Sequence, residues 1–114
     1  MTSRTAEIKV TVELDSDNLA TRIAWQASET PDAGAAQCQS MMLALWDSGK
    51  KSTAAIDLWT RDMTVDDMNF FVYQVLHKIA ATYLRATKNA AMAQSIHEFG
   101  DKFGQTFGFT MRGL

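Results

Sequence analysis

The sequence predicts an α+β domain in which a four-stranded antiparallel sheet, made of two β-hairpins, is followed by two helices packed on one face of the sheet. Two patterns lead to this prediction. Apolar and polar residues alternate in several segments before residue 60, whereas apolar residues recur every three or four positions after residue 64. The chain has 114 residues, the length of one domain. We therefore expect a single domain over residues 1–114, with flexible tails at about 1–5 and 109–114.

Two alternating segments form the first predicted hairpin. Residues 7–14 place apolar side chains at every second position, and residues 21–27 repeat the pattern around Ile23 and Trp25. Between them, residues 15–18 (Asp-Ser-Asp-Asn) are all turn formers. Two strands joined by a short polar turn are typical of an antiparallel hairpin.

The second predicted hairpin lies between residues 40 and 59, after a loop at 28–38 that contains the single proline of the chain. Residues 40–46 are apolar on both faces, a pattern that suits a short helix as well as a strand. A turn at 47–51 and renewed alternation at 54–59 favour two strands.

Two helices are predicted at residues 64–87 and 90–107, each with a broad apolar stripe. Thr64 is a natural N-cap for the first helix. Asp66 and Asp67 resemble a pair of acid/base groups, but negative charge is favoured in a first helical turn, so we assign them to capping.

Gly100 and Gly104 lie inside the second predicted helix. Each glycine weakens an isolated helix by about 1 kcal/mol relative to alanine. Both glycines alternatively permit another helix or the sheet to approach closely.

Strand pleating assigns alternate residues to opposite faces of the sheet. The face expected beneath the helices carries these residues: Ile8, Val10, Val12, Ile23, Trp25, Leu43, Leu45, Ile56 and Leu58. The open face then holds Met42, Trp46, Asp57 and Trp59. Because exposed apolar patches mark contact surfaces, we expect these four residues to form a docking or dimer face. Alternatively, the helix ends or the 28–38 loop cover the two indole rings.

Few residues suggest reaction chemistry. Tyr73 with His77, and His97 with Asp101, have the helical spacing of paired ligands, but two ligands do not complete a zinc site. We expect these four side chains on solvated helix faces. Cys38 is the single cysteine and has no histidine near it in sequence, so we expect a structural thiol. No catalytic residue, metal or cofactor is therefore predicted.

Composition excludes several classes of protein. Eleven basic and thirteen acidic residues give a net charge of −2, which disfavours nucleic-acid binding. The longest apolar run, residues 41–46, is far shorter than the roughly 20 residues that cross a bilayer, so we expect no membrane insertion. No apolar segment follows the N-terminus, so we expect no signal peptide and a cytoplasmic location.

Residues 56–68, IDLWTRDMTVDDM, resemble the strand-to-helix junction of the gliding motility-associated protein GldC family. Further similarity lies at Leu45-Trp46-Asp47 and Arg85-Ala86-Thr87, and the resemblance spans about residues 7–103. The chain departs from the family's pattern in lacking proline near residues 20 and 64 and in having an apolar rather than charged C-terminal end. The resemblance implies an accessory role in bacterial surface gliding, and it supplies no catalytic residues.

These observations predict a non-enzymatic accessory protein of the gliding machinery that acts through protein–protein contacts at the open sheet face. The expected partners are proteins of the gliding or associated secretion apparatus, with a homodimer as another arrangement. The alternative is a small ligand-binding or hydrolytic domain with a pocket between sheet and helices. That alternative requires a polar cluster in the pocket, whereas the predicted stripes are almost wholly apolar.

Overall fold

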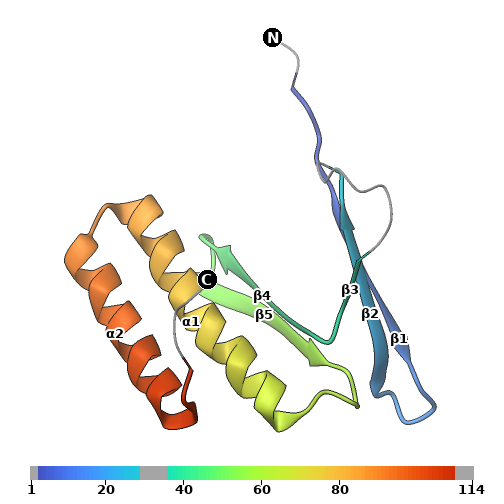
Figure 1. Cartoon of the computed structure of the whole chain (residues 1–114). Coiled ribbons are helices and arrows are strands. Elements are labelled where there is room, and N and C mark those ends of the chain that lie inside the picture. The colour runs from blue at the N-terminus through green and yellow to red at the C-terminus, as the bar shows by residue number, and fades with distance from the viewer. Residues whose placement is uncertain (1–2, 29–35, 110–114) are drawn as a thin grey trace. The chain divides into compact units, whose positions relative to one another are not determined.

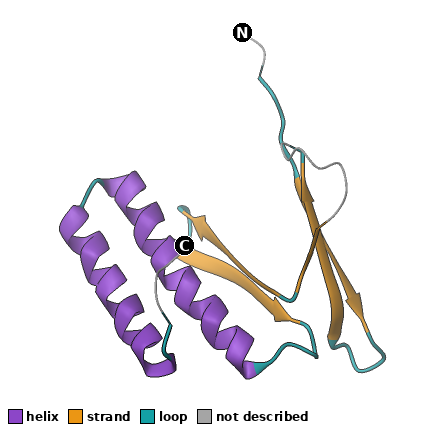
Figure 2. Cartoon of the chain, viewed as in Figure 1, coloured by secondary structure: helices purple, strands orange, loops and turns teal. Residues whose placement is uncertain are grey.

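The computed structural model describes residues 3–28 and 36–109 (Figures 1 and 2). The strands precede the two helices, as the sequence predicts, but the described residues form five strands rather than four: β1 (Ile8–Leu14), β2 (Ala20–Ala27), β3 (Ala36–Cys38), β4 (Ser40–Asp47), β5 (Ser52–Trp59), α1 (Val65–Thr87) and α2 (Ala90–Phe107). The chain forms two compact units, one containing all strands up to residue 63 and the other containing both helices from residue 64 onward.

The strands form two sheets, so the prediction of one four-stranded sheet is wrong. One sheet has the order β1-β2-β3, and the other contains β4 and β5 alone. The difference arises at β3, which lies within the predicted 28–38 loop and pairs with β2 through Ile23↔Cys38 and Trp25↔Ala36. Because β1 pairs with the other edge of β2, neither edge of β2 remains for the second hairpin. The rest of the predicted loop, residues 29–35, lies outside the described residues.

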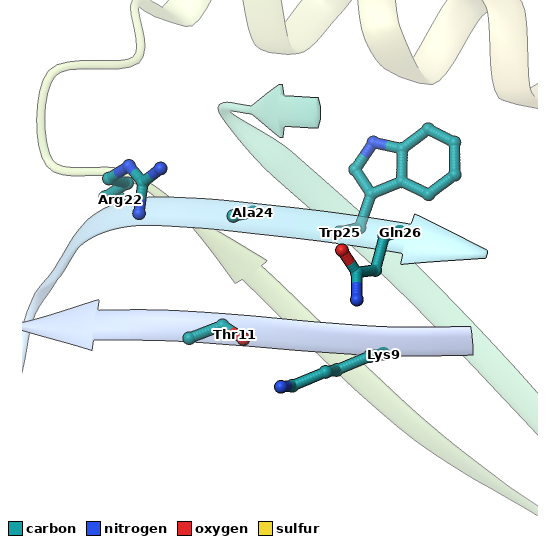
Figure 3. Close-up of a pocket in the computed structure, with 6 residues that line it drawn as sticks. All are labelled: Lys9, Thr11, Arg22, Ala24, Trp25 and Gln26. Atoms are coloured by element: carbon teal, nitrogen blue, oxygen red, sulfur yellow. The ribbon is translucent and has the colours of Figure 1, made fainter. Parts of the chain in front are cut away.

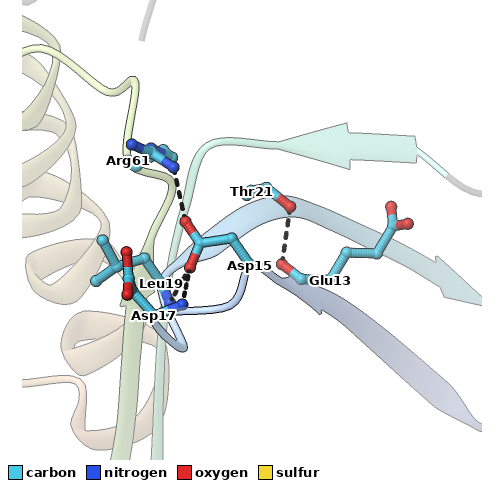
Figure 4. Close-up of polar contacts among 6 residues, drawn as sticks. All are labelled: Glu13, Asp15, Asp17, Leu19, Thr21 and Arg61. Atoms are coloured by element: carbon cyan, nitrogen blue, oxygen red, sulfur yellow. Dashed lines mark hydrogen bonds and ion pairs between the residues drawn. The ribbon is translucent and has the colours of Figure 1, made fainter.

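The turn between β1 and β2 is organised by the carboxylate of Asp15. Its Oδ1 accepts hydrogen bonds from the backbone N–H groups of Asp17 (2.8 Å) and Leu19 (3.0 Å). Its Oδ2 accepts a hydrogen bond from Arg61 Nη1 at 2.7 Å (Figure 4). The Arg61 backbone N–H also donates to the carbonyl of Ala20 at 2.9 Å. These bonds tie the chain that leaves β5 to the start of β2.

Burial is concentrated at β2 in the strand unit. Ile23 is fully buried, and Ala20, Ala24 and Thr60 are buried with it. Of the other residues expected on a covered sheet face, Val12 and Leu58 are half-buried. The remainder are exposed, which differs from the prediction: Ile8, Val10, Trp25, Leu43, Leu45 and Ile56.

The helix ends follow the sequence signals. Thr64 is the N-cap of α1, and its side-chain oxygen accepts from the Asp67 backbone N–H at 3.0 Å, which confirms the predicted cap. Asn89 caps α2 in the same way, through the Met92 backbone N–H. Gly108 ends α2 at φ 76°, a left-handed conformation that glycine adopts without strain.

The two helices meet through small residues on α2. Ala93, Gly100 and Gly104 are buried there, and the two glycines lie against His77 and Tyr73 of α1. A Cβ atom at Gly104 would overlap Tyr73 Cε1 and lie 2.8 Å from Cδ1, while one at Gly100 would lie 2.8 Å from His77 Nε2. The glycines therefore permit close helix–helix approach, which is one of the two roles that the sequence left open.

The ring of Phe109, the first residue of the predicted C-terminal tail, packs beyond the end of α2. The ring centroid of Phe109 lies 4.8 Å from that of Phe70 and 5.4 Å from that of Tyr73. The other residues of the predicted tail, 110–114, lie outside the described residues.

The hydrogen bonds to Asp15 generate a stability prediction. The Leu19 N–H hydrogen bond, the Asp17 N–H and the Arg61 charge hold the pKa of Asp15 below its ordinary value of 3.8 despite partial burial. A carboxyl with a lowered folded-state pKa contributes stability above its unfolded pKa, and that contribution is lost as pH falls through the folded pKa. We expect Asp15→Ala to lower the urea midpoint measured by tryptophan fluorescence at pH 6. The difference from wild type should shrink below pH 4.

Asp17→Ala is the matched control, since Asp17 contributes only its backbone N–H to this turn. An equal loss of stability in the two variants would contradict the assignment of the Asp15 side chain as the organising group.

Gly104→Ala tests the close approach of the helices. Overpacking a core typically costs about 1–3 kcal/mol, whereas replacing a helical glycine by alanine gains about 1 kcal/mol. Because Tyr73 is 1% exposed and its ring has little room to move, we expect a net loss of stability in urea unfolding followed by far-UV circular dichroism. Gln105→Ala, on the exposed side of α2, should leave stability nearly unchanged. A more stable Gly104→Ala protein would contradict the proposed constraint.

Candidate functional site

The register of β4 and β5 places the four predicted contact residues on one face of the hairpin. Met42 lies directly opposite Asp57, and the two tryptophans lie toward opposite ends, with Trp46 facing Thr53 and Trp59 facing Ser40. Six residues of strand separate the two ends, a span of about 20 Å at ~3.3 Å per residue. We call Met42, Trp46, Asp57 and Trp59 the tryptophan face.

The apolar members of the tryptophan face are open to solvent. Trp46 is 63% exposed, Trp59 57% and Met42 51%. Asp57 is also exposed and stands between the two indole rings along β5. The face therefore offers two aromatic anchors with a carboxylate between them, residue types that are common where a protein contacts another polypeptide.

The opposite face of the same hairpin is also apolar and exposed, which sequence reasoning missed. Leu45 is 54% exposed, Ile56 48% and Leu43 41%. The signal lies in residues 40–46, which are apolar on both faces, although strand alternation assigns half of them to a covered face. We call Leu43, Leu45 and Ile56 the aliphatic face.

The hairpin that carries both faces has a well-defined tip. The Asp47 Oδ1 atom accepts hydrogen bonds from the backbone N–H groups of Gly49 (3.0 Å) and Lys50 (3.1 Å). Lys51 adopts a left-handed conformation with φ 52°. At the other end of the hairpin, the Ser40 hydroxyl donates to the Leu58 carbonyl at 3.2 Å. These bonds fix the register that puts the tryptophans on one face.

Three chemistry-bearing residues of the helices lie together. The prediction that they are solvated is wrong for the buried His77, whereas His97 is half-buried and Asp101 is exposed. His77 Nδ1 lies 2.7 Å from His97 Nδ1, and His77 Nε2 lies 3.4 Å from Asp101 Oδ1. His77 is 5% exposed, and Tyr73, also predicted to be solvated, is buried with its ring edge against the imidazole. The missed signal is spacing, because positions 73, 77 and 80 form one helical stripe that faces the buried small residues of α2.

Burial and neighbouring charge shift two pKa values in this cluster. Burial lowers the pKa of His77 from its ordinary value, and the His97 ring lowers it further, while the Asp101 carboxylate opposes both effects. Burial raises the pKa of Tyr73, and the Asp101 charge adds to that rise. Near neutral pH, the folded protein therefore favours an uncharged His77 and an un-ionised Tyr73.

The single cysteine of the chain, Cys38, is half-buried in β3, opposite Ile23, and its thiol is free.

Within residues 3–28 and 36–109, no group of three histidine, cysteine or acidic side chains is arranged to hold a metal ion. In the same segments, neither α1 nor α2 has the length and apolar character that a bilayer-crossing helix requires.

A shallow open hollow of about 190 Å³ lies on the β1–β2 hairpin (Figure 3). Lys9 and Gln26 face each other across its floor, and Thr11 lies opposite Ala24. Arg22 also lines the hollow, but its guanidinium is paired with Glu13 at 3.0 Å. Apart from the buried Ala24, the hollow is lined by exposed residues, and it contains no grouping of nucleophile and base.

The strands, helices and exposed tryptophan face define a small α+β protein with an apolar hairpin open to contact. Comparison with protein families gives a match over residues 20–108 to the family described as gliding motility-associated protein GldC-like. The match extends from β2 to the end of α2, so the chain belongs to the GldC-like family. Comparisons with curated proteins and with solved structures gave no significant match.

The exposure of the tryptophan face predicts that its rings contribute little to folding. We expect the Trp46→Ala/Trp59→Ala protein to fold and to lose about 1 kcal/mol or less per site in urea unfolding, because exposed cross-strand side chains contribute at most that amount. Trp25 remains as the single fluorescent tryptophan to follow the transition.

Ile23→Ala provides the contrast, since Ile23 is fully buried. Truncating a buried isoleucine typically costs about 2–5 kcal/mol. A tryptophan double variant that is destabilised as strongly as Ile23→Ala would show that the rings belong to the core.

Proposed function

We propose that this GldC-like protein is a non-enzymatic accessory component of the bacterial gliding machinery that binds a protein partner through the tryptophan face. Membership of the GldC-like family supports the process. The exposure of Trp46 and Trp59 on one face of a registered hairpin supports the mode of action. Tryptophan is prominent among the residues that dominate interface energies because its large ring buries much area at little entropic cost.

The exposure of two indole rings is the observation that carries this proposal. A binding face of this type places aromatic anchors in pockets of the partner, and the Asp57 carboxylate between them fixes the register through a polar contact. A basic or hydrogen-bond-donating group on the partner suits this position. The partner is then a protein of the gliding or associated secretion apparatus, or a second copy of this chain.

Affinity capture from the native cell tests the proposal by comparing wild type with Trp46→Ala/Trp59→Ala. We expect the double variant to lose at least tenfold of the captured gliding or secretion components, measured by quantitative mass spectrometry, since loss of hot-spot aromatics usually costs 2 kcal/mol or more. Light scattering after size exclusion, on the same two proteins, shows whether the partner is a second copy.

Leu45→Ala/Ile56→Ala is the matched control, because it removes exposed apolar side chains from the aliphatic face of the same hairpin. Undiminished binding by this variant assigns the contact to the tryptophan face. Undiminished binding by the tryptophan variant would instead refute the proposed site.

A further inference from the structure

The histidine content of the chain is concentrated at one contact between the helices. The chain has two histidines, and both lie in the cluster, with Nδ1 atoms 2.7 Å apart. Histidine is the side chain whose unperturbed pKa lies between pH 5 and 8. Both histidines of the chain therefore lie where α1 and α2 contact each other.

The Nδ1···Nδ1 distance limits how many protons the two rings hold. A nitrogen–nitrogen hydrogen bond of 2.7 Å contains one proton, so one ring donates and the other accepts. The Asp101 carboxylate, 3.4 Å from His77 Nε2, favours a proton on that nitrogen. His77 Nδ1 then accepts from His97 Nδ1–H. In this arrangement each ring is neutral, in agreement with the burial of His77.

One added proton leaves the contact intact, because a single N–H still lies between the two Nδ1 atoms and either ring can be its donor. A second added proton places an N–H on both Nδ1 atoms. Two N–H groups cannot face each other at 2.7 Å, so protonation of both rings forces them apart.

We propose that the His77–His97 contact is an acid-sensitive connection between α1 and α2, which holds near neutral pH and opens when both rings are protonated. The His77 ring is enclosed by its neighbours. Its separation from His97 therefore requires the two helices to move apart, because the side chain has no room to rotate. Gly100 leaves no free space on the Nε2 side, since a Cβ there would lie 2.8 Å from this nitrogen, and the Tyr73 ring stands edge-on at a centroid distance of 5.1 Å. The ring therefore has no vacant position between the helices.

The groups that face His77 determine the pH range. From α2 these are His97 and Asp101, and from α1 the un-ionised Tyr73. Desolvation is the largest effect, and it lowers the folded-state pKa below the ordinary value of 6.5 although Asp101 acts in the opposite direction. The unfolded chain therefore binds the proton first, so stability is greatest above pH 6.5 and declines as pH falls from there toward the folded-state pKa.

Urea unfolding of the full chain at pH 7.5 and 5.5 tests the proposal, followed by far-UV circular dichroism and by amide hydrogen exchange. Between these values, one histidine with an unfolded pKa near 6.5 and a well-lowered folded pKa raises the unfolding equilibrium constant by up to about tenfold. We expect a rise of several-fold in wild type, with exchange accelerating in α1 and α2 more than in β1 and β2. A stability that does not change between these pH values would overturn the proposal.

Two variants separate the histidine contact from simple burial. In His97→Gln the amide oxygen can accept from a protonated His77 Nδ1–H, so we expect a clearly smaller pH dependence than in wild type. In Asp101→Asn the carboxylate that favours protonated His77 is removed, so the dependence should become steeper. Both sites are at least partly exposed and tolerate these changes of similar size. An unchanged pH dependence in His97→Gln would show that burial alone, and not the ring contact, controls the helices.

Discussion

The close approach of α1 and α2 is the constraint on which the helical unit depends. Gly100 and Gly104, four positions apart on α2, remove the side chains that would keep the helices separate. The space is filled by two rings from α1, those of Tyr73 and His77, which are among the most buried groups of the protein. The energetic cost of placing glycine inside a helix is thus offset by the burial of aromatic surface. The same approach brings the two imidazole rings within hydrogen-bond distance.

The strand unit follows a different principle, since its second hairpin is organised by hydrogen bonds rather than by burial. The β4–β5 ladder and the Asp47 turn set the register, while apolar side chains on both faces stay exposed. Exposed apolar surface on this scale is unusual for a monomeric protein and is typical of a surface that meets another polypeptide. A rigid register matters for such a surface, because a slip of one residue would move Trp46 and Met42 to the opposite face.

Most element boundaries could be predicted from the sequence because long segments carry a clear period. Both helices and the four longer strands agree with prediction to within about two residues. The short strand β3 could not be predicted, since three residues carry no measurable period, and its pairing with β2 is what divides the predicted sheet in two. Strand alternation predicted that the residues of the tryptophan face share one side of the hairpin. It also predicted a covered aliphatic face, which is exposed.

The burial of His77 could not be predicted, because hydropathy treats histidine as polar and the decisive partners are distant in sequence. His77 and His97 are 20 positions apart, and only the packing of two helices brings them together. The two glycines of α2 stand out in the sequence, but whether they weaken the helix or make room for a ring depends on the residues that lie opposite. Long-range partners of this kind are determined by tertiary structure and not by local pattern.

The link between Asp15 and Arg61 has a practical consequence for where this chain can be shortened. A polypeptide begun at Ala20, where the family match starts, would keep β2 but lose β1. Its Arg61 guanidinium would have no carboxylate at 2.7 Å, and one edge of β2 would present unpaired N–H and C=O groups to other molecules. Such edges promote aggregation. The smallest recombinant fragment with an intact first sheet therefore begins before Ile8, upstream of the family match.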